Sequence, residues 1–272
     1  MSTKARPFVE TDASQTLMRN YLEYAARIKD QDINRDLLST VVDKFVALEK
    51  RVDALLKNTL PPTVADEIKY SGTFAPRSYD CTILFCDVAG FTSLAERLSS
   101  SELVAIIDSI FDGFDQVVTK FQGTKIKTIG DAYMVVFGAP MAITEHASLA
   151  VRTAAEMLTF LNSFNHSRFG SRREHYFRCR IGIHSGMVTA GVVGSLRMQF
   201  DVFGDTVNIA SRFESTGEAG RINISEDTRQ LLPAIFSCAD RGEVALKNRG
   251  LMRAYFVTAI SDDHWQENKD DR

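Results

Sequence analysis

The chain has 272 residues, enough for one or two domains and for a core that needs neither disulfides nor a structural metal. Hydrophobic residues make up 44% and charged residues 25%, which excludes the disordered and fibrous classes of protein. The net charge of −3 gives no bulk attraction to nucleic acid or to anionic lipid, so we expect neither as a partner.

Cysteine usage and apolar runs bear on the compartment. The four cysteines form no C-x-x-C pair and lie in stretches typical of strand interiors, so we expect them to be reduced core residues. No apolar run reaches the roughly 18 residues of a membrane span, and the N-terminus lacks the apolar core of a signal peptide. The sequence therefore predicts a cytoplasmic protein with no membrane span.

The N-terminal part divides into a polar segment, residues 1–37, and a helix, residues 38–60. In the helix, apolar residues recur at alternating spacings of three and four, which is the pattern of a short parallel coiled coil. An amphipathic helix docked on its own domain is the alternative. The heptad positions are Leu38, Val41, Phe45, Leu48, Val52 and Leu55. Proline ends helices, so Pro61-Pro62 should start a connector over residues 61–77.

Residues 78–258 mix strand and helix patterns in an order that predicts an α+β fold, a central sheet with flanking helices, followed by a polar tail over residues 259–272. Glycines should separate short strands between residues 177 and 203. The other expected elements are an apolar strand at 82–88, a serine-capped helix at 101–121, a hairpin around Gly130-Asp131, and helices at 144–164 and 205–216.

Two aspartates stand where strands end. Asp87 closes the apolar strand 82–88, and Asp131 lies at the tip of the predicted hairpin. Two carboxylates without a nearby histidine or cysteine favour hard cations such as Mg²⁺ or Mn²⁺ over zinc, and paired ions serve phosphoryl chemistry. Taken singly, each aspartate also suits a turn or a helix cap.

Three further stretches make the sequence similar to a known family. The runs are FCDVAGFTSLAE, KIKTIGDAYMVVFGAP and FDVFGDTVNIASRFES, in that order along the chain. They resemble the three motifs of the class III adenylyl and guanylyl cyclase catalytic domain. The resemblance covers roughly residues 78–258 and implies the family's palm-type, ferredoxin-like α+β fold with a mostly antiparallel sheet.

The resemblance implies a role for individual residues. By position, Asp87, Asp131 and the carbonyl of Val88 match the ligands of two divalent cations, Mg²⁺ or Mn²⁺. The other matched residues are Phe91 and Thr92 for the terminal phosphates, Lys127 and Asp201 for adenine, Asn208 for the ribose, and Arg212 for the transition state. Independently of the family, Asn208 and Arg212 are four apart and so share one face of the helix 205–216.

One loop departs from the family's pattern. The chain has Lys247-Asn248-Arg249-Gly250 where family members commonly carry Lys-Gly-Lys-Gly. Lys247 matches the phosphate-binding lysine, but the altered glycine can change the path of the loop, and Arg249 could take over the role.

The predicted substrate is ATP. An ammonium only donates and a carboxylate only accepts, so Lys127 with Asp201 complements the edge of adenine and mismatches guanine. The expected reaction is attack of the ribose 3′-oxygen on the α-phosphorus, which gives 3′,5′-cyclic AMP and pyrophosphate. In the family the metal and base residues of one site come from two chains, so a homodimer with two shared sites is expected. A guanylyl cyclase and an inactive nucleotide-binding or dimerisation module are the alternatives, and the N-terminal helix could link to a sensor domain or a regulatory partner.

Overall fold

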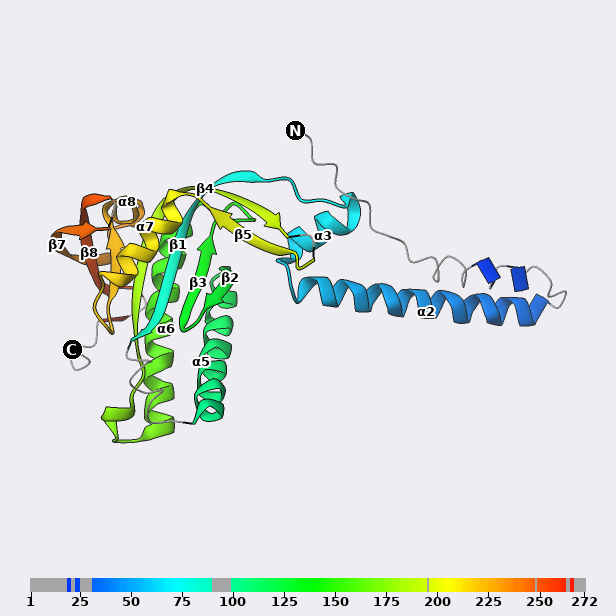
Figure 1. Ribbon diagram of the computed structural model, residues 1–272, viewed down its shortest axis with the longest axis horizontal. Coiled ribbons are helices and arrows are strands. Elements are labelled where there is room, and N and C mark those ends of the chain that lie inside the picture. Colours follow the sequence, from blue (N-terminus) through cyan, green and yellow to red (C-terminus); the bar gives the residue numbers. More distant parts are fainter. Residues whose placement is uncertain are drawn as a thin grey trace. The chain divides into compact units, whose positions relative to one another are not determined.

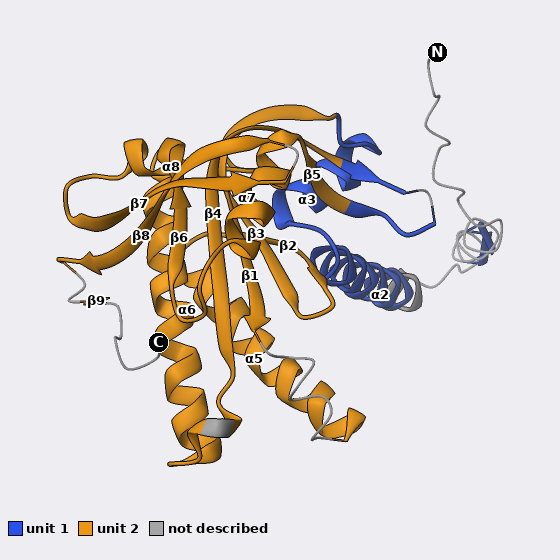
Figure 2. Ribbon diagram, turned by 60° about the vertical axis from the view of Figure 1, so that its left-hand side comes forward, with its two compact units in different colours: residues 1–75, 192–199 blue, residues 76–191, 200–272 orange. Residues whose placement is uncertain are grey.

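The structure is a computed structural model that describes residues 19–20, 23–24, 31–89, 99–194, 196–247, 249–262 and 265–266. The chain divides into two compact units, one of residues 1–75 and 192–199 and the other of residues 76–191 and 200–272 (Figure 2). Residues 78–258, predicted to form the catalytic domain, lie almost wholly within the second unit.

Helices make up most of the described part of the first unit. Helix α2 spans Gln31–Lys57, so it begins before the predicted residue 38. Helix α3, Pro62–Ser71, occupies most of the segment predicted to be a connector. Pro62 fits the start of α3, because the first turn of a helix is where the missing N–H of proline has no intrahelical partner. Ion pairs join the two helices, among them Lys57 Nζ to Asp66 Oδ1 at 3.0 Å.

The second unit is built on one sheet in the order β2-β3-β1-β4-β6-β8-β7, with β5 paired to β4 and β9 to β8. Every pairing with a described register is antiparallel except β4 with β6, which confirms the predicted α+β fold with a mostly antiparallel sheet. The strands are β1 Arg77–Ala89, β2 Thr124–Ile129, β3 Ala132–Phe137, β4 Arg178–Val193, β5 Gln199–Phe203, β6 Ile222–Ser225, β7 Phe236–Leu246, β8 Gly250–Ile260 and β9 Trp265–Gln266.

The predicted hairpin is confirmed at β2 and β3. Ile129 pairs with Ala132, and Gly130 between them has a φ of 65°, a left-handed conformation that glycine adopts without a steric cost. Strand β1 runs between β3 and β4, and Asp87 pairs with Ala132 on one side and with Arg180 on the other. The register therefore brings Asp87 close to the tip of the β2–β3 hairpin.

Helices α5, Ser100–Lys120, and α6, His146–Phe169, lie side by side along one face of the sheet (Figures 1 and 2). The predicted serine cap of α5 is present, at Ser99: its side chain accepts from Glu102 N at 3.3 Å, and Glu102 Oε2 accepts from Ser99 N at 3.1 Å. The core beneath these helices holds apolar residues of β1, β3 and β4, including Leu84, Val135 and Ile181. The remaining helical segments are α7 Asp205–Ser215, α8 Glu226–Leu231 and a short 3₁₀ turn, Arg173–His175.

Strand β4 runs unbroken through Gly182, Gly186 and Gly191, where we predicted short strands separated by glycines. The glycines serve packing instead. A Cβ on Gly182 would lie 1.9 Å from the backbone nitrogen of Glu214, and one on Gly186 would lie 3.0 Å from Thr206 Oγ1. Both neighbours belong to α7, so the missing side chains let this helix lie directly against the strand.

A chain of buried side-chain hydrogen bonds crosses the sheet between two histidines. His146 Nδ1 lies 2.7 Å from Thr82 Oγ1, which lies 2.7 Å from Ser185 Oγ. The chain continues through Thr228 and Ser225, and ends where Ser225 Oγ lies 2.8 Å from His184 Nδ1. Burial lowers the pKa of both imidazoles, which favours their neutral forms.

The cysteines are free thiols, and three of them, Cys81, Cys86 and Cys179, are buried, as expected for reduced core residues; Cys238 is partly exposed. Within the described part of the chain, none of the helices combines the length and the apolar character that crossing a lipid bilayer requires.

Candidate functional site

Asp87 and Asp131 lie close together, as predicted. Asp87 stands near the end of β1, Asp131 lies in the β2–β3 turn, and Val88 N donates to the carbonyl of Asp131 at 3.4 Å. Burial raises the pKa of Asp87, and the charge of Asp131 adds to this, while Arg180 opposes both. The two carboxylates are therefore near enough to repel each other, a repulsion that a bound cation would relieve.

These residues fit hard divalent cations. The described residues contain no cluster of three or more His, Cys, Asp or Glu side chains that could cage a metal. Mg²⁺ seldom uses such a cage; it is usually held by one or two carboxylates together with substrate phosphates and water. Asp87 and Asp131, with the Val88 carbonyl predicted from the sequence, supply a donor set of this kind.

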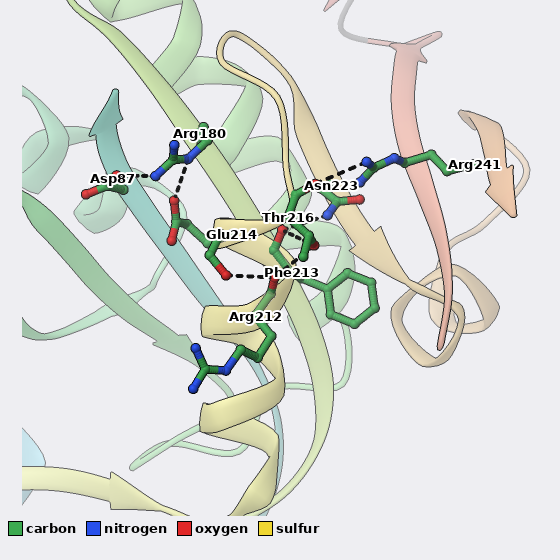
Figure 3. Close-up of polar contacts among 9 residues, drawn as sticks. Asp87, Arg180, Arg212, Phe213, Glu214, Thr216, Asn223 and Arg241 are labelled. Atoms are coloured by element: carbon green, nitrogen blue, oxygen red, sulfur yellow. Dashed lines mark hydrogen bonds and ion pairs between the residues drawn. The ribbon is translucent and has the colours of Figure 1, made fainter. Parts of the chain in front are cut away.

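Sequence reasoning missed an arginine beside the acidic pair. Arg180 of β4 donates from Nη2 to Asp87 Oδ2 at 2.6 Å and from Nε to Glu214 Oε1 at 2.9 Å (Figure 3). The register pairs Arg180 with Asp87 across β1 and β4, so the two side chains share a face of the sheet. The sequence signal was the alternation in RCRIGIH, which puts Arg180 on the face opposite Cys179 and Ile181.

Lys127 and Asp201 are brought together across 74 positions of sequence. Lys127 Nζ of β2 lies 2.5 Å from Asp201 Oδ2 of β5. The Asp201 side chain is 10% exposed, and its other oxygen accepts from Val202 N at 2.9 Å. The carboxylate is thus held in place by its own strand, while the Lys127 side chain, 32% exposed, remains accessible to a ligand.

Asn208 and Arg212 lie on α7, Asn208 exposed and Arg212 partly exposed. Other elements hold the carbonyls at the end of this helix: Asn223 Nδ2 donates to Phe213 O at 2.6 Å, and Arg241 Nη2 donates to Thr216 O at 3.1 Å (Figure 3). These bonds satisfy carbonyls that a helix end leaves without intrahelical partners, and so fix the turn from which Arg212 projects.

The described contacts bring the predicted residues of one chain together in two pairs, Asp87 near Asp131 and Lys127 with Asp201. In the described part of the chain, no hydrogen bond or ion pair links the acidic pair to the remaining predicted residues. Those remaining residues are Lys127, Asp201, Asn208, Arg212 and Lys247.

The residues predicted to contact phosphate lie partly outside the described part of the chain. Phe91 and Thr92 lie outside the described residues. Lys247 is exposed, whereas Arg249 pairs with Asp205 at the start of α7.

A family description, "Adenylate and Guanylate cyclase catalytic domain", matches residues 74–259. Among curated proteins, receptor-type guanylate cyclase gcy-8 of Caenorhabditis elegans is 39% identical over 223 residues, which cover 79% of this chain and 19% of that protein. Atrial natriuretic peptide receptor 2 of Rattus norvegicus is 38% identical over 217 residues, which cover 78% of this chain and 20% of the receptor. The chain thus spans about a fifth of the length of these relatives.

Solved structures of both cyclase types resemble the chain. The adenylyl cyclase CyaB from P. aeruginosa has a TM-score of 0.65 and 30% identity, covering 68% of this chain and 96% of that one. The catalytic core of a rhodopsin-guanylyl cyclase with converted specificity, in complex with ATPαS, has a TM-score of 0.62 and 36% identity, covering 68% of this chain and 98% of that one.

Proposed function

The chain belongs to the family of adenylate and guanylate cyclase catalytic domains, and we propose that it is an adenylyl cyclase, which converts ATP to 3′,5′-cyclic AMP and pyrophosphate. The preference for adenine over guanine is inferred from one observation, the contact of Lys127 with Asp201. Adenine presents an amino donor at position 6 and an acceptor at N1, which a carboxylate and an ammonium complement. Guanine presents the opposite pattern, so both groups would lose partners, at a cost of roughly 1–3 kcal/mol each.

A guanylyl cyclase is the second candidate, because one of the curated relatives described above, gcy-8 of Caenorhabditis elegans, is a guanylate cyclase by name. Guanylyl members of the family usually carry Glu and a small residue such as Cys at the two base-reading positions. This chain carries Lys127 and Asp201 there, which favours adenine.

Asp87, Asp131 and the Val88 carbonyl would hold two divalent cations, Mg²⁺ or Mn²⁺. When bound, such ions lower the pKa of the ribose 3′-hydroxyl and neutralise phosphate charge. Arg212 would meet the charge that grows on the α-phosphate, Asn208 would orient the ribose, and Lys247, with Phe91 and Thr92, would contact the terminal phosphates. A protein general base is not needed for this scheme.

Two copies of the chain would share each site. This chain carries both the metal-binding and the base-reading residues expected of the family, so a two-fold homodimer would have two equivalent sites, each built from both chains. Mixing tests this arrangement: Asp87→Ala and Lys127→Glu proteins, each inactive alone, should form heterodimers with one intact site. Confirmed subunit exchange without recovered activity would refute shared-site catalysis.

The N-terminal helix offers a further contact between copies. The heptad residues Leu38, Phe45, Leu48, Val52 and Leu55 of α2 are between 44% and 60% exposed. Facing a second α2 in a parallel coiled coil would bury them and could transmit a signal from a sensor domain or partner. Replacing Leu48 with Asp should lower the association constant of the dimer, measured by sedimentation equilibrium.

The deciding experiment measures cyclic AMP from ATP and cyclic GMP from GTP, with Mg²⁺ or Mn²⁺ present. We expect cyclic AMP, and the Lys127→Glu, Asp201→Cys double variant should shift the preference toward GTP. Cyclic GMP as the main product of the wild-type chain would establish the second candidate. An absence of both products from the folded chain would refute both cyclase candidates.

A further inference from the structure

Two carboxylates from different elements share one edge of the Arg180 guanidinium. Nε and Nη2 carry the parallel N–H groups that a single carboxylate takes side-on with two bonds. Here Nε donates to Glu214 Oε1 of α7 at 2.9 Å, whereas Nη2 donates to Asp87 Oδ2 of β1 at 2.6 Å (Figure 3). Each carboxylate thus accepts one N–H from this edge of the guanidinium, although either carboxylate alone could accept both.

The charges in this group depend on one another. Burial raises the pKa of Asp87 and of Glu214, and Arg180 opposes the shift in both. The Glu214 side chain is 12% exposed and that of Asp87 is 19% exposed, so solvent screens the group incompletely. A cation on the Asp87 carboxylate would stand next to the guanidinium and repel it. Arg180 and a metal ion therefore compete for the Asp87 carboxylate.

We propose that Glu214 is a positioning residue that receives the Arg180 guanidinium when a divalent cation takes Asp87. Glu214 Oε2 can accept the N–H that Asp87 gives up, so Arg180 loses no hydrogen bond in the exchange. The backbone of Glu214 lies directly against Gly182, two residues along β4 from Arg180, because a Cβ on Gly182 would lie 1.9 Å from Glu214 N. The inference rests on the metal-binding part of the proposed function and not on the choice of base.

Removing the Glu214 carboxylate has a definite consequence for metal binding. The Arg180 guanidinium then has Asp87 as its counter-ion. A cation that binds Asp87 must compete with Arg180, and no second carboxylate accepts the N–H that Arg180 gives up. Removing the Glu214 carboxylate from a chain that lacks Arg180 should change the metal affinity much less, because no guanidinium then competes for Asp87. The two substitutions should therefore be coupled in a double-mutant cycle.

The test measures Mn²⁺ binding to the nucleotide-free full chain, with free Mn²⁺ determined by electron paramagnetic resonance. Glu214→Gln should weaken the Asp87-dependent binding by roughly 5- to 30-fold, the size of coupling found between charges in contact. In an Arg180→Gln background, Glu214→Gln should change the affinity by less than about twofold. If Glu214→Gln changes the Mn²⁺ affinity equally in the wild-type and Arg180→Gln backgrounds, the proposed exchange is wrong. It is also wrong if the wild-type chain shows no Mn²⁺ binding that depends on Asp87.

Two matched variants separate the exchange from general effects. Glu218→Gln removes a carboxylate that pairs with Arg221 at 3.0 Å, and it should leave Mn²⁺ affinity within about twofold. Glu214→Asp keeps the charge and should bind Mn²⁺ more tightly than Glu214→Gln; if it binds no more tightly, the charge of Glu214 is not what matters. Urea unfolding of each variant identifies any that fails to fold. If Glu214→Gln is one of them, Glu214→Asp carries the test: its shorter side chain should weaken Mn²⁺ binding relative to the wild type only where Arg180 is present. Because the readout is binding of Mn²⁺ alone, a wild-type chain that makes cyclic GMP would refute the proposed substrate and leave this inference standing.

Discussion

Adding one methyl group at Gly182 should separate the helix that carries Asn208 and Arg212 from the sheet. The new Cβ would lie 1.9 Å from Glu214 N, 2.4 Å from Glu214 Cα and 2.5 Å from Phe213 C. All three are backbone atoms of α7, so a rotamer change cannot relieve the contact. The helix must move by roughly 1.5 Å or more to restore an ordinary separation of about 3.5 Å.

The expected result is a large loss of turnover with a smaller loss of stability. A misplacement of about 1 Å at a catalytic group can cost 100-fold in rate, and Arg212 would move with its helix, so kcat should fall by about 100-fold or more. Overpacking of this kind costs about 1–3 kcal/mol, which leaves a folded protein to assay. The assay pairs the steady-state kinetics of cyclic nucleotide formation with the free energy of unfolding in urea.

The same strand provides graded controls. A Cβ on Gly191 would have its nearest contact at 3.5 Å, with Pro76 Cγ, so Gly191→Ala should keep both kcat and stability. Gly186→Ala should be intermediate, because its contact at 3.0 Å is with the Thr206 side chain. If Gly182→Ala has the kcat and stability of the wild type, the close approach of α7 to β4 does not position the site.

Three predictions concern stability and are measured by urea unfolding. Ser99→Ala removes the hydroxyl that caps α5 and should lower the free energy of unfolding by about 1 kcal/mol; an unchanged value would mean that the cap contributes nothing. Thr82→Val leaves His146 and Ser185 without their shared buried partner and should cost about 1–3 kcal/mol, an expectation that a neutral effect contradicts. Because burial lowers the pKa of His146 and His184, the unfolded chain binds protons first as the pH falls. Stability should therefore be complete above the unfolded pKa of about 6.5 and decline below it. His146→Gln should reduce that decline between pH 6.5 and 5, and a slope equal to that of the wild type would argue against His146 as its source.

Local sequence patterns predicted a feature correctly where all the residues that form the feature lie within one short stretch of chain. The Ser99 cap, the Gly130 turn and the face shared by Asn208 and Arg212 each depend on residues within one helix turn or one hairpin. Pairing Lys127 with Asp201 rested on the family resemblance, and the tertiary fold brings the two side chains into contact from β2 and β5.

Motifs and turn signals are local, and they were enough to identify the family, the α+β class and the chemical types of the candidate site residues. The role of the glycines of β4 and the groups that surround Asp87 became clear only from the folded chain. Gly182 reads as a strand break until α7 packs on it, and Arg180 reads as a surface residue until the β1–β4 register sets it between Asp87 and Glu214. The physical reason is that close approach and charge pairing depend on distances between atoms far apart in the chain, which no local pattern specifies.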